Sequence, residues 1–197
     1  MRKLMYIVIG AVVLFAGLQA WTVAGTKRTP QQPYTVLRTI GALEVRHYPA
    51  ALAAETVRPG GTYKQVANPS FRTLAGYIFG GNADGASIAM TAPVHMQLDP
   101  DSARMRFIMP EGLSMDSLPA PNDRAVQLRN VPEEVVAVLR FGGFADEARI
   151  TGMTGELLRS TAAAGLVPIG PARFLGYDPP WQLVARRNEV AVPVSWP

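Results

Sequence analysis

The chain has 197 residues, 48% of them hydrophobic and 17% charged, with 18 Gly and 17 Pro. This composition is typical of a globular protein and excludes collagen, coiled coils and disordered chains. Cys is absent, which excludes disulfide scaffolds, iron–sulfur clusters, thiolate zinc sites and thiol nucleophiles. The two histidines, His47 and His95, are too few for a three-histidine metal site. Without Arg2 and Lys3 the chain has 17 basic and 15 acidic residues, a balance that argues against nucleic acid as a partner.

Residues 1–25 are predicted to be a signal peptide or a membrane anchor. Arg2 and Lys3 precede an uncharged run from Leu4 to Leu18. As a helix, the apolar stretch through Ala24 would be about 31 Å long, the thickness of one hydrocarbon core. The small residues at 22–24 also suit cleavage by signal peptidase, so a retained anchor and a cleaved signal both stay open. We therefore expect the rest of the chain either anchored in the inner membrane and facing the periplasm, or soluble in the periplasm.

Residues 26–33 contain nothing to bury and are predicted to be a linker, after which residues 34–197 are long enough for one domain. The domain is expected to begin with strands at 35–39, 43–48 and 50–57. Alternation within the second strand places His47 on the same face as Leu43 and Val45.

A helix is predicted next, with Asn68 as its N-cap, Pro69 at its first position and Gly80-Gly81 after its end. One face of this helix carries an apolar stripe with the spacing i, i+3, i+4 and i+7, formed by Phe71, Leu74, Ala75 and Ile78. Packing on a sheet is the simplest interpretation of such a stripe.

Two more strands complete the first half, and the second half then repeats the order of the first. Strands are expected at 88–98 and 104–109, then at 125–130 and 135–141, followed by a helix at about 145–164 and closing strands at 172–177 and 189–194. In the first of these strands His95 is on the more polar side and is expected to be a solvated surface histidine. The pattern predicts an α+β domain with two helices and an antiparallel sheet that curls toward a barrel, built from two similar strand-helix-strand halves.

Five motifs carry a family resemblance. They are Phe71-x-x-Leu-x-x-Tyr77-Ile78-x-Gly80-x-Asn82, Ile88-Ala-Met-Thr-Ala-Pro-Val94, Arg140-Phe-Gly-Gly143, Gly176-Tyr-Asp-Pro-Pro-Trp181 and Arg186-Arg-Asn-Glu-Val190. In this order they resemble the SOUL haem-binding protein family over nearly all of residues 34–194. The resemblance implies a distorted antiparallel β-barrel flanked by two helices, in agreement with the periodicity.

The resemblance also implies non-covalent binding of haem or another tetrapyrrole, in a shallow apolar site beside the first helix of the domain and near the loop before the last strand. By position, the stripe of Phe71, Leu74, Ala75 and Ile78 would face the edge of the macrocycle, and Trp181 with Gln182 would cover it. The propionates need basic partners, which Arg72 or the pair Arg186-Arg187 would supply. A structural ion-pair group at the start of a strand is the alternative role for Arg186, Arg187 and Glu189.

His47 is the candidate ligand of the haem iron, because a neutral imidazole nitrogen binds iron in other haem proteins. A hydrogen-bonded core histidine is the alternative. Met90 is a softer candidate ligand, although a position on an apolar strand face makes a core role the simpler one.

The sequence offers no support for an enzyme, since it contains no Gly-x-Ser-x-Gly elbow, His-Glu-x-x-His helix, P-loop or dinucleotide fingerprint. We therefore expect a binding protein. The competing hypothesis is a membrane-tethered module that binds another amphipathic small molecule, or a protein partner, without haem.

Overall fold

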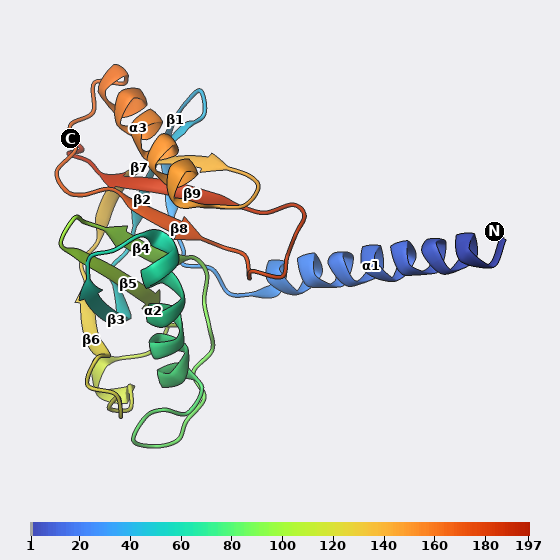
Figure 1. Cartoon of the computed structure of the whole chain (residues 1–197). Coiled ribbons are helices and arrows are strands. Elements are labelled where there is room, and N and C mark those ends of the chain that lie inside the picture. Colours follow the sequence, from blue (N-terminus) through green and yellow to red (C-terminus); the bar gives the residue numbers. More distant parts are fainter. Residues whose placement is uncertain (1) are drawn as a thin grey trace.

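A computed structural model describes residues 2–197 as one long N-terminal helix followed by a curled sheet with two further helices (Figure 1). The elements are α1 (Arg2–Arg28), β1 (Thr35–Ile40), β2 (Leu43–Tyr48), β3 (Ala51–Pro59), α2 (Tyr63–Ile78), β4 (Val94–Leu98), β5 (Ser102–Ile108), η1 (Met115–Ser117), β6 (Gln127–Val131), β7 (Glu134–Phe141), α3 (Glu147–Ala163), β8 (Arg173–Gly176) and β9 (Asn188–Pro193). The nine strands form one sheet in the order β1-β2-β7-β9-β8-β4-β5-β3-β6, and all neighbours are antiparallel. The predicted α+β class is confirmed.

The pairing of the strands shows how the two halves are joined. One half is β2-β3-α2-β4-β5 and the other is β6-β7-α3-β8-β9. The first strand of each half pairs with the second strand of the other half, since β2 pairs with β7 and β6 pairs with β3. The third strands, β4 and β8, pair with each other in the middle of the sheet. The fold is therefore a duplication in which the halves exchange a strand.

Both faces of the sheet are buried over much of their area. The helices cover one face, where α2 packs on β3 and β5, and α3 packs on β9, β7 and β2. On this face the ring of Phe71 contacts Phe107 at 5.2 Å between centroids. The opposite face has a second apolar cluster, formed by Tyr48, Ala92, Val136, Val138, Leu175, Tyr177 and Ala191.

The helix α2 begins six residues before the position predicted from Asn68-Pro69, so that part of the sequence prediction is wrong. Its N-cap is Thr62, whose N–H donates to Oε1 of Gln65 at 3.0 Å. Pro69 therefore lies inside the helix, on an exposed part of its surface, where its missing N–H removes the hydrogen bond to the carbonyl oxygen of Gln65. The predicted end at Gly80-Gly81 holds, because α2 ends at Ile78 and Gly80 has a φ of +102°.

The strand predicted at 88–98 is shorter than expected, and its histidine lies in a different environment. Only Val94–Leu98 forms β4. His95 is 5% exposed, which overturns the prediction of a solvated surface histidine. Burial, followed by the charges of Arg173 and Arg106, lowers the pKa of His95 well below 6.5. The prediction failed because it assumed one solvated sheet face, whereas the curled sheet encloses both.

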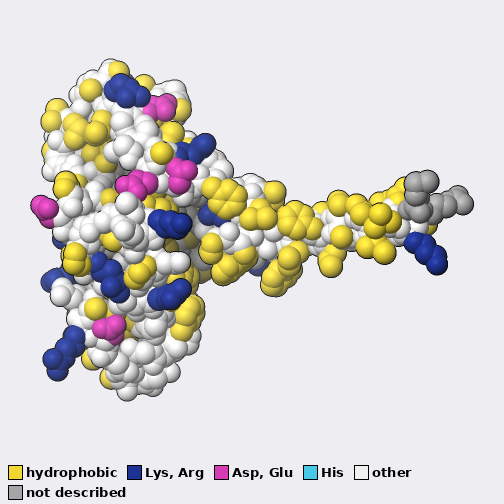
Figure 2. Space-filling model, viewed as in Figure 1, with side chains coloured by type: hydrophobic (Ala, Val, Ile, Leu, Met, Phe, Trp, Pro, Cys, Tyr) yellow, Lys and Arg dark blue, Asp and Glu magenta, His cyan; other side chains and the backbone are white. Residues whose placement is uncertain are grey.

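The N-terminal helix α1 projects away from the domain (Figure 1), and apolar side chains cover most of the length of its visible face (Figure 2). Residues Lys3–Arg28 are long and apolar enough to cross a membrane, with a mean hydropathy of 2.1, a property that signal sequences share. Helix α1 includes the first residues of the predicted linker. Further along that linker, Gln32 is buried, and its N–H donates to the carbonyl oxygen of Ala92 at 2.8 Å.

Candidate ligand-binding site

A cleft of about 250 Å³ lies on the helix side of the domain, beside the connection between β8 and β9. We call it the loop cleft. It is bounded by the first turn of α2, the turn before α3, β8 and the β8–β9 loop (residues 177–187). Its lining residues are Tyr63, Phe144, Ala145, Phe174, Gly176, Asp178, Pro180, Arg186 and Asn188. Three aromatic rings therefore contribute to its wall.

The walls of the loop cleft are stiffened by aromatic packing. The rings of Tyr63 and Phe174 pack edge to face with 5.8 Å between their centroids, and the ring of Phe141 packs on Phe174 with 6.3 Å between centroids. Burial raises the pKa of the Tyr63 phenol, against the opposing charge of Arg186. Tyr63 thus presents a neutral, half-buried ring to the cleft.

Arg186 supplies a positive charge at the cleft. Its guanidinium lies 4.8 Å from the ring centroid of Phe144. Its terminal nitrogens donate to the carbonyl oxygens of Pro179 at 2.8 Å, Gln182 at 2.6 Å and Asp178 at 3.3 Å. Its Nε is buried and has no partner among the described residues. The loop carbonyls therefore position a cation that still has one donor to offer.

The β8–β9 loop holds its own shape around Gln182. This side chain is almost fully buried, and its Nε2 donates to Oδ1 of Asp178 at 3.0 Å and to the carbonyl oxygen of Val184 at 3.2 Å. The amide nitrogen of Gln182 is therefore used within the loop, whereas its neighbour Trp181 is 66% exposed beside the cleft.

The stripe residues predicted on the helix lie together, but they face β3 and β5 rather than the loop cleft. Leu74 and Ile78 are fully buried in the core, while Phe71 and Ala75 are half-buried against it. Arg72 is exposed. The residue that α2 contributes to the cleft is Tyr63, which the sequence reasoning missed because it started the helix too late. The capping pattern of Thr62 and Gln65 is the signal that would have found it.

The structure does not bring His47 together with the α2 stripe. His47 lies on β2, and its Nε2 is 3.2 Å from Oε2 of Glu133. Its side chain is 35% exposed. Four strands, β7, β9, β8 and β4, separate β2 from β5, on which α2 packs. The alternative ligand Met90 is half-buried against the helix-side core.

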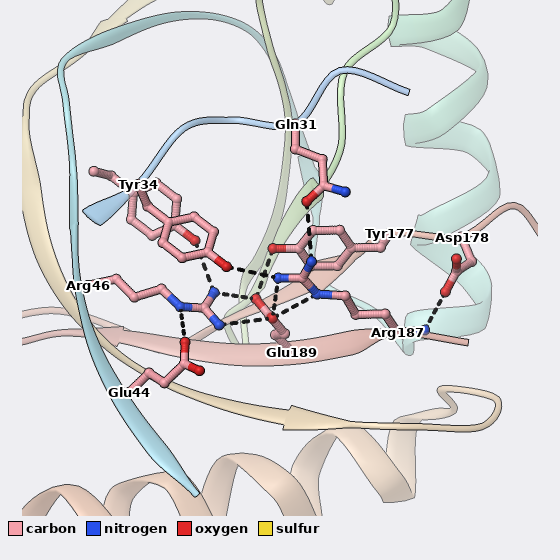
Figure 3. A network of polar contacts seen from close by, with 9 residues as sticks. Gln31, Tyr34, Glu44, Arg46, Tyr177, Asp178, Arg187 and Glu189 are labelled. Carbon is pink, nitrogen blue, oxygen red and sulfur yellow. Dashed lines mark hydrogen bonds and ion pairs between the residues drawn. The ribbon is translucent and has the colours of Figure 1, made fainter. Parts of the chain in front are cut away.

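A buried ionic network occupies the opposite face of the sheet (Figure 3). At its centre Glu189 accepts hydrogen bonds from Arg46, from Arg187 at 2.8 Å and from the Tyr177 hydroxyl at 2.9 Å. Tyr34 covers the network, with its ring centroid 4.2 Å from the Arg46 guanidinium carbon. Arg187 and Glu189 thus form a structural ion pair, and of the two adjacent arginines it is Arg186 that lines the loop cleft.

A second, larger cavity of about 900 Å³ lies beside residues 30–33, at the turns between β2 and β3 and between β6 and β7. We call it the linker cavity. Its wall is mostly proline and aliphatic side chains, and of its polar atoms Gln32 Oε1 is buried without a partner in the described residues. Residues 2–197 supply Glu111 but no Lys, Arg or His to this wall. The linker cavity is therefore matched to a neutral or cationic apolar molecule rather than to an anion.

Comparisons with known proteins agree with this architecture. Heme-binding protein 1 of Sus scrofa is 28% identical over 123 residues, which are 58% of this chain and 64% of that protein. The chain thus spans less than two thirds of that relative. Heme-binding protein 2 of Mus musculus is 28% identical over 158 residues, covering 76% of this chain and 77% of the relative.

Among solved structures, the C-terminal domain of EcmrR superposes with a TM-score of 0.61 at 10% identity, covering 82% of this chain and 98% of that domain. An uncharacterized conserved protein from Listeria innocua gives a TM-score of 0.59 at 12% identity, covering 84% of this chain and 94% of that one. These two matches show the fold alone. The family described as SOUL heme-binding protein matches residues 29–193, which is most of the sequence and contains every strand and both packed helices, and the chain therefore belongs to that family.

Proposed function

We propose that this chain is a binding protein rather than an enzyme, and that it binds haem or another tetrapyrrole non-covalently in the loop cleft. Family membership supports the class of ligand. The observation that carries the location is the unpartnered, buried Nε of Arg186 beside aromatic walls. An apolar macrocycle with carboxylate side chains needs these two kinds of group, an aromatic surface and a fixed cation.

The residues of the loop cleft suit the apolar macrocycle and the carboxylates of haem better than they suit its iron. Tyr63, Phe144 and Phe174 would contact the macrocycle, and Arg186 would bind one propionate. When bound, haem supplies its own absorbance and redox chemistry. Neither histidine lines the cleft, and the raised pKa of Tyr63 disfavours a phenolate ligand. At 250 Å³ the cleft is smaller than typical ligand sites of about 300–1,000 Å³, so part of the macrocycle would stay outside it, beside Trp181.

Titration of the full chain with hemin tests this proposal, with the Soret band as the readout. Gly176 forms part of the cleft wall, and a Cβ there would lie 3.3 Å from the Phe174 ring. Gly176→Leu should therefore fill the cleft and weaken hemin binding at least tenfold. Gly152→Leu is the matched control, because a Cβ at Gly152 meets no atom within 4 Å. Equal binding by both variants and the unchanged chain would refute the loop cleft as the site.

The linker cavity supports a second candidate function, the binding of a neutral amphipathic molecule without haem. The neutral fluorescent probe N-phenylnaphthylamine should then bind, and Ala50→Phe, which places a ring at the cavity wall, should reduce its fluorescence gain. Gly176→Leu should leave that gain unchanged. The two variants therefore separate the two candidate functions.

We further propose that α1 directs the domain out of the cytoplasm, either as a retained inner-membrane anchor or as a cleaved signal. The apolar length of the helix supports both versions. A retained anchor should resist carbonate extraction and leave the domain open to protease added to spheroplasts. Cleavage should instead give a soluble periplasmic species shorter by about 24 residues. Recovery from the cytoplasm would contradict both versions.

A further inference from the structure

The β8–β9 loop is attached to α1 by a pair of reciprocal hydrogen bonds. Gln19 Nε2 donates to the carbonyl oxygen of Trp181 at 3.3 Å, and the N–H of Leu183 donates to Gln19 Oε1 at 2.8 Å. About two helical turns further along α1, the Thr26 hydroxyl donates to Gln182 Oε1 at 2.7 Å. Together with the buried Thr22, these side chains form a polar stripe on an otherwise apolar helix. The loop therefore has a fixed position along α1.

That position corresponds to one boundary of the bilayer if α1 is a retained anchor. At 1.5 Å per residue, Gln19 lies about 22 Å and Thr26 about 33 Å from Leu4, the first apolar residue after Lys3. A hydrocarbon core is about 30 Å thick, so the stripe spans the boundary at which α1 leaves the core. Lys27 and Arg28 follow directly, where lipid headgroups would be.

The part of the loop beside this boundary is apolar and exposed. Trp181, Leu183 and Val184 are 66%, 44% and 49% exposed, and Trp21 on α1 is exposed at the same level of the helix. Tryptophan is enriched at membrane–water interfaces, because its ring is apolar and its N–H still reaches a polar partner. In water these side chains would form an uncovered apolar surface, whereas at the lipid interface they are in a matching environment.

We propose that the β8–β9 loop is a second membrane contact, with Trp181, Leu183 and Val184 in the interfacial region of the leaflet that α1 leaves. The partner is the lipid surface itself. This inference rests on the retained-anchor version of the proposed function. It also places the loop cleft, whose wall includes Pro180 and Arg186, directly at the bilayer surface, so that an amphipathic ligand dissolved in the lipid reaches the cleft without crossing water.

The three tryptophans of the chain provide the test. Full-length variants that retain only Trp21, Trp181 or Trp196, with phenylalanine at the other two positions, are placed in phosphatidylcholine–phosphatidylglycerol vesicles that contain lipids brominated at different depths. Trp181 should emit at a shorter wavelength than in water and be quenched most by bromines near the headgroup. Trp196 is next to the C-terminus, which lies on the side of the domain away from α1, and it should not be quenched (Figure 1).

Trp21 reports on the anchor independently of the loop. Quenching of Trp21 without quenching of Trp181 would overturn the membrane contact of the loop and leave the anchor standing. Lack of quenching at Trp21 would overturn the anchor and the inference that depends on it. In the variant that retains Trp181, Leu183→Asp should reduce its quenching at least twofold. Leu158→Asp, at a leucine on α3 that is 41% exposed, is the matched control and should leave it unchanged.

Discussion

Arg46 binds Glu189 through both terminal nitrogens of its guanidinium, at 2.7 and 3.1 Å, and the pair crosses the intervening strand β7. Arg46 belongs to the first half of the duplication and Glu189 to the second. Both side chains are buried, so neither can replace its partner with water. The ion pair therefore ties the two halves together on the face that the helices leave free.

Glu189→Leu should destabilise the domain by about 3–5 kcal/mol, because Arg187 loses its carboxylate partner and the buried Arg46 keeps only the partly exposed Glu44. Thermal unfolding of the full chain in detergent, followed by near-ultraviolet circular dichroism, measures the loss. Adding Arg46→Met should recover part of it, since an apolar pair needs no desolvation of charge. An unchanged melting temperature for Glu189→Leu would show that Arg46 finds another partner.

Stability should fall as the pH is lowered from 7 to 5, because of His95. Burial and the charges of Arg173 and Arg106 lower the pKa of His95 well below 6.5, so the unfolded chain binds a proton in this window and the folded chain does not. The slope for one such group approaches about 1.4 kcal/mol per pH unit below the unfolded pKa. His95→Gln should flatten the slope. Equal slopes for His95→Gln and the unchanged chain would contradict the prediction.

Arg186→Gln should weaken hemin binding by about tenfold, the effect of losing one charge-assisted hydrogen bond to a propionate. Protoporphyrin dimethyl ester has no free carboxylates, so its affinity for Arg186→Gln should be within about twofold of its affinity for the unchanged chain. Arg186 also donates to carbonyl oxygens of the β8–β9 loop, so its substitution can change the shape of the loop. Such a change would weaken binding of the ester as well, which makes the ester the control. A similar loss for both ligands would mean that Arg186 acts only through the shape of the loop.

His47→Ala should leave the Soret maximum of the hemin complex unchanged, because His47 lies beside Glu133 and away from the loop cleft. Metal-free protoporphyrin should bind within about threefold of hemin if apolar contact and charge supply most of the affinity. Absorbance and fluorescence titrations compare the two ligands. A Soret shift in His47→Ala would restore this histidine as the iron ligand.

Local patterns predicted most of the fold. The alternation from Leu43 to Tyr48 gives β2 with its observed ends, and the helix predicted at 145–164 is α3 with small changes at its ends. Two features were predicted wrongly, for different reasons. The start of α2 was displaced because the Asn68-Pro69 signal resembles a helix start, and the burial of His95 follows from the curl of the whole sheet.

The candidate site matches the location that the resemblance implies, but its lining residues differ from the expected ones. The resemblance implies a site beside the first helix of the domain and near the loop before the last strand, where the loop cleft lies. The residues of its wall come from four separate segments, and no periodic pattern marks Tyr63 or Phe144 as lining residues. The capping pattern of Thr62 and Gln65 places Tyr63 at the start of α2 but does not assign it to a site. Conversely, the apolar stripe with Leu74 and Ile78 had a strong pattern because it packs on the sheet.

The duplicated halves differ most in one connection. The turn between β4 and β5 has three residues, 99–101, and lies directly against Gly60, whose N–H donates to the carbonyl oxygen of Asp101 at 2.9 Å. The equivalent connection between β8 and β9 has eleven residues, 177–187, and borders the loop cleft. One half thus closes this end of the sheet while the other leaves an opening, so under the proposed function substitutions in a single surface loop alter ligand preference without any change in the shared core.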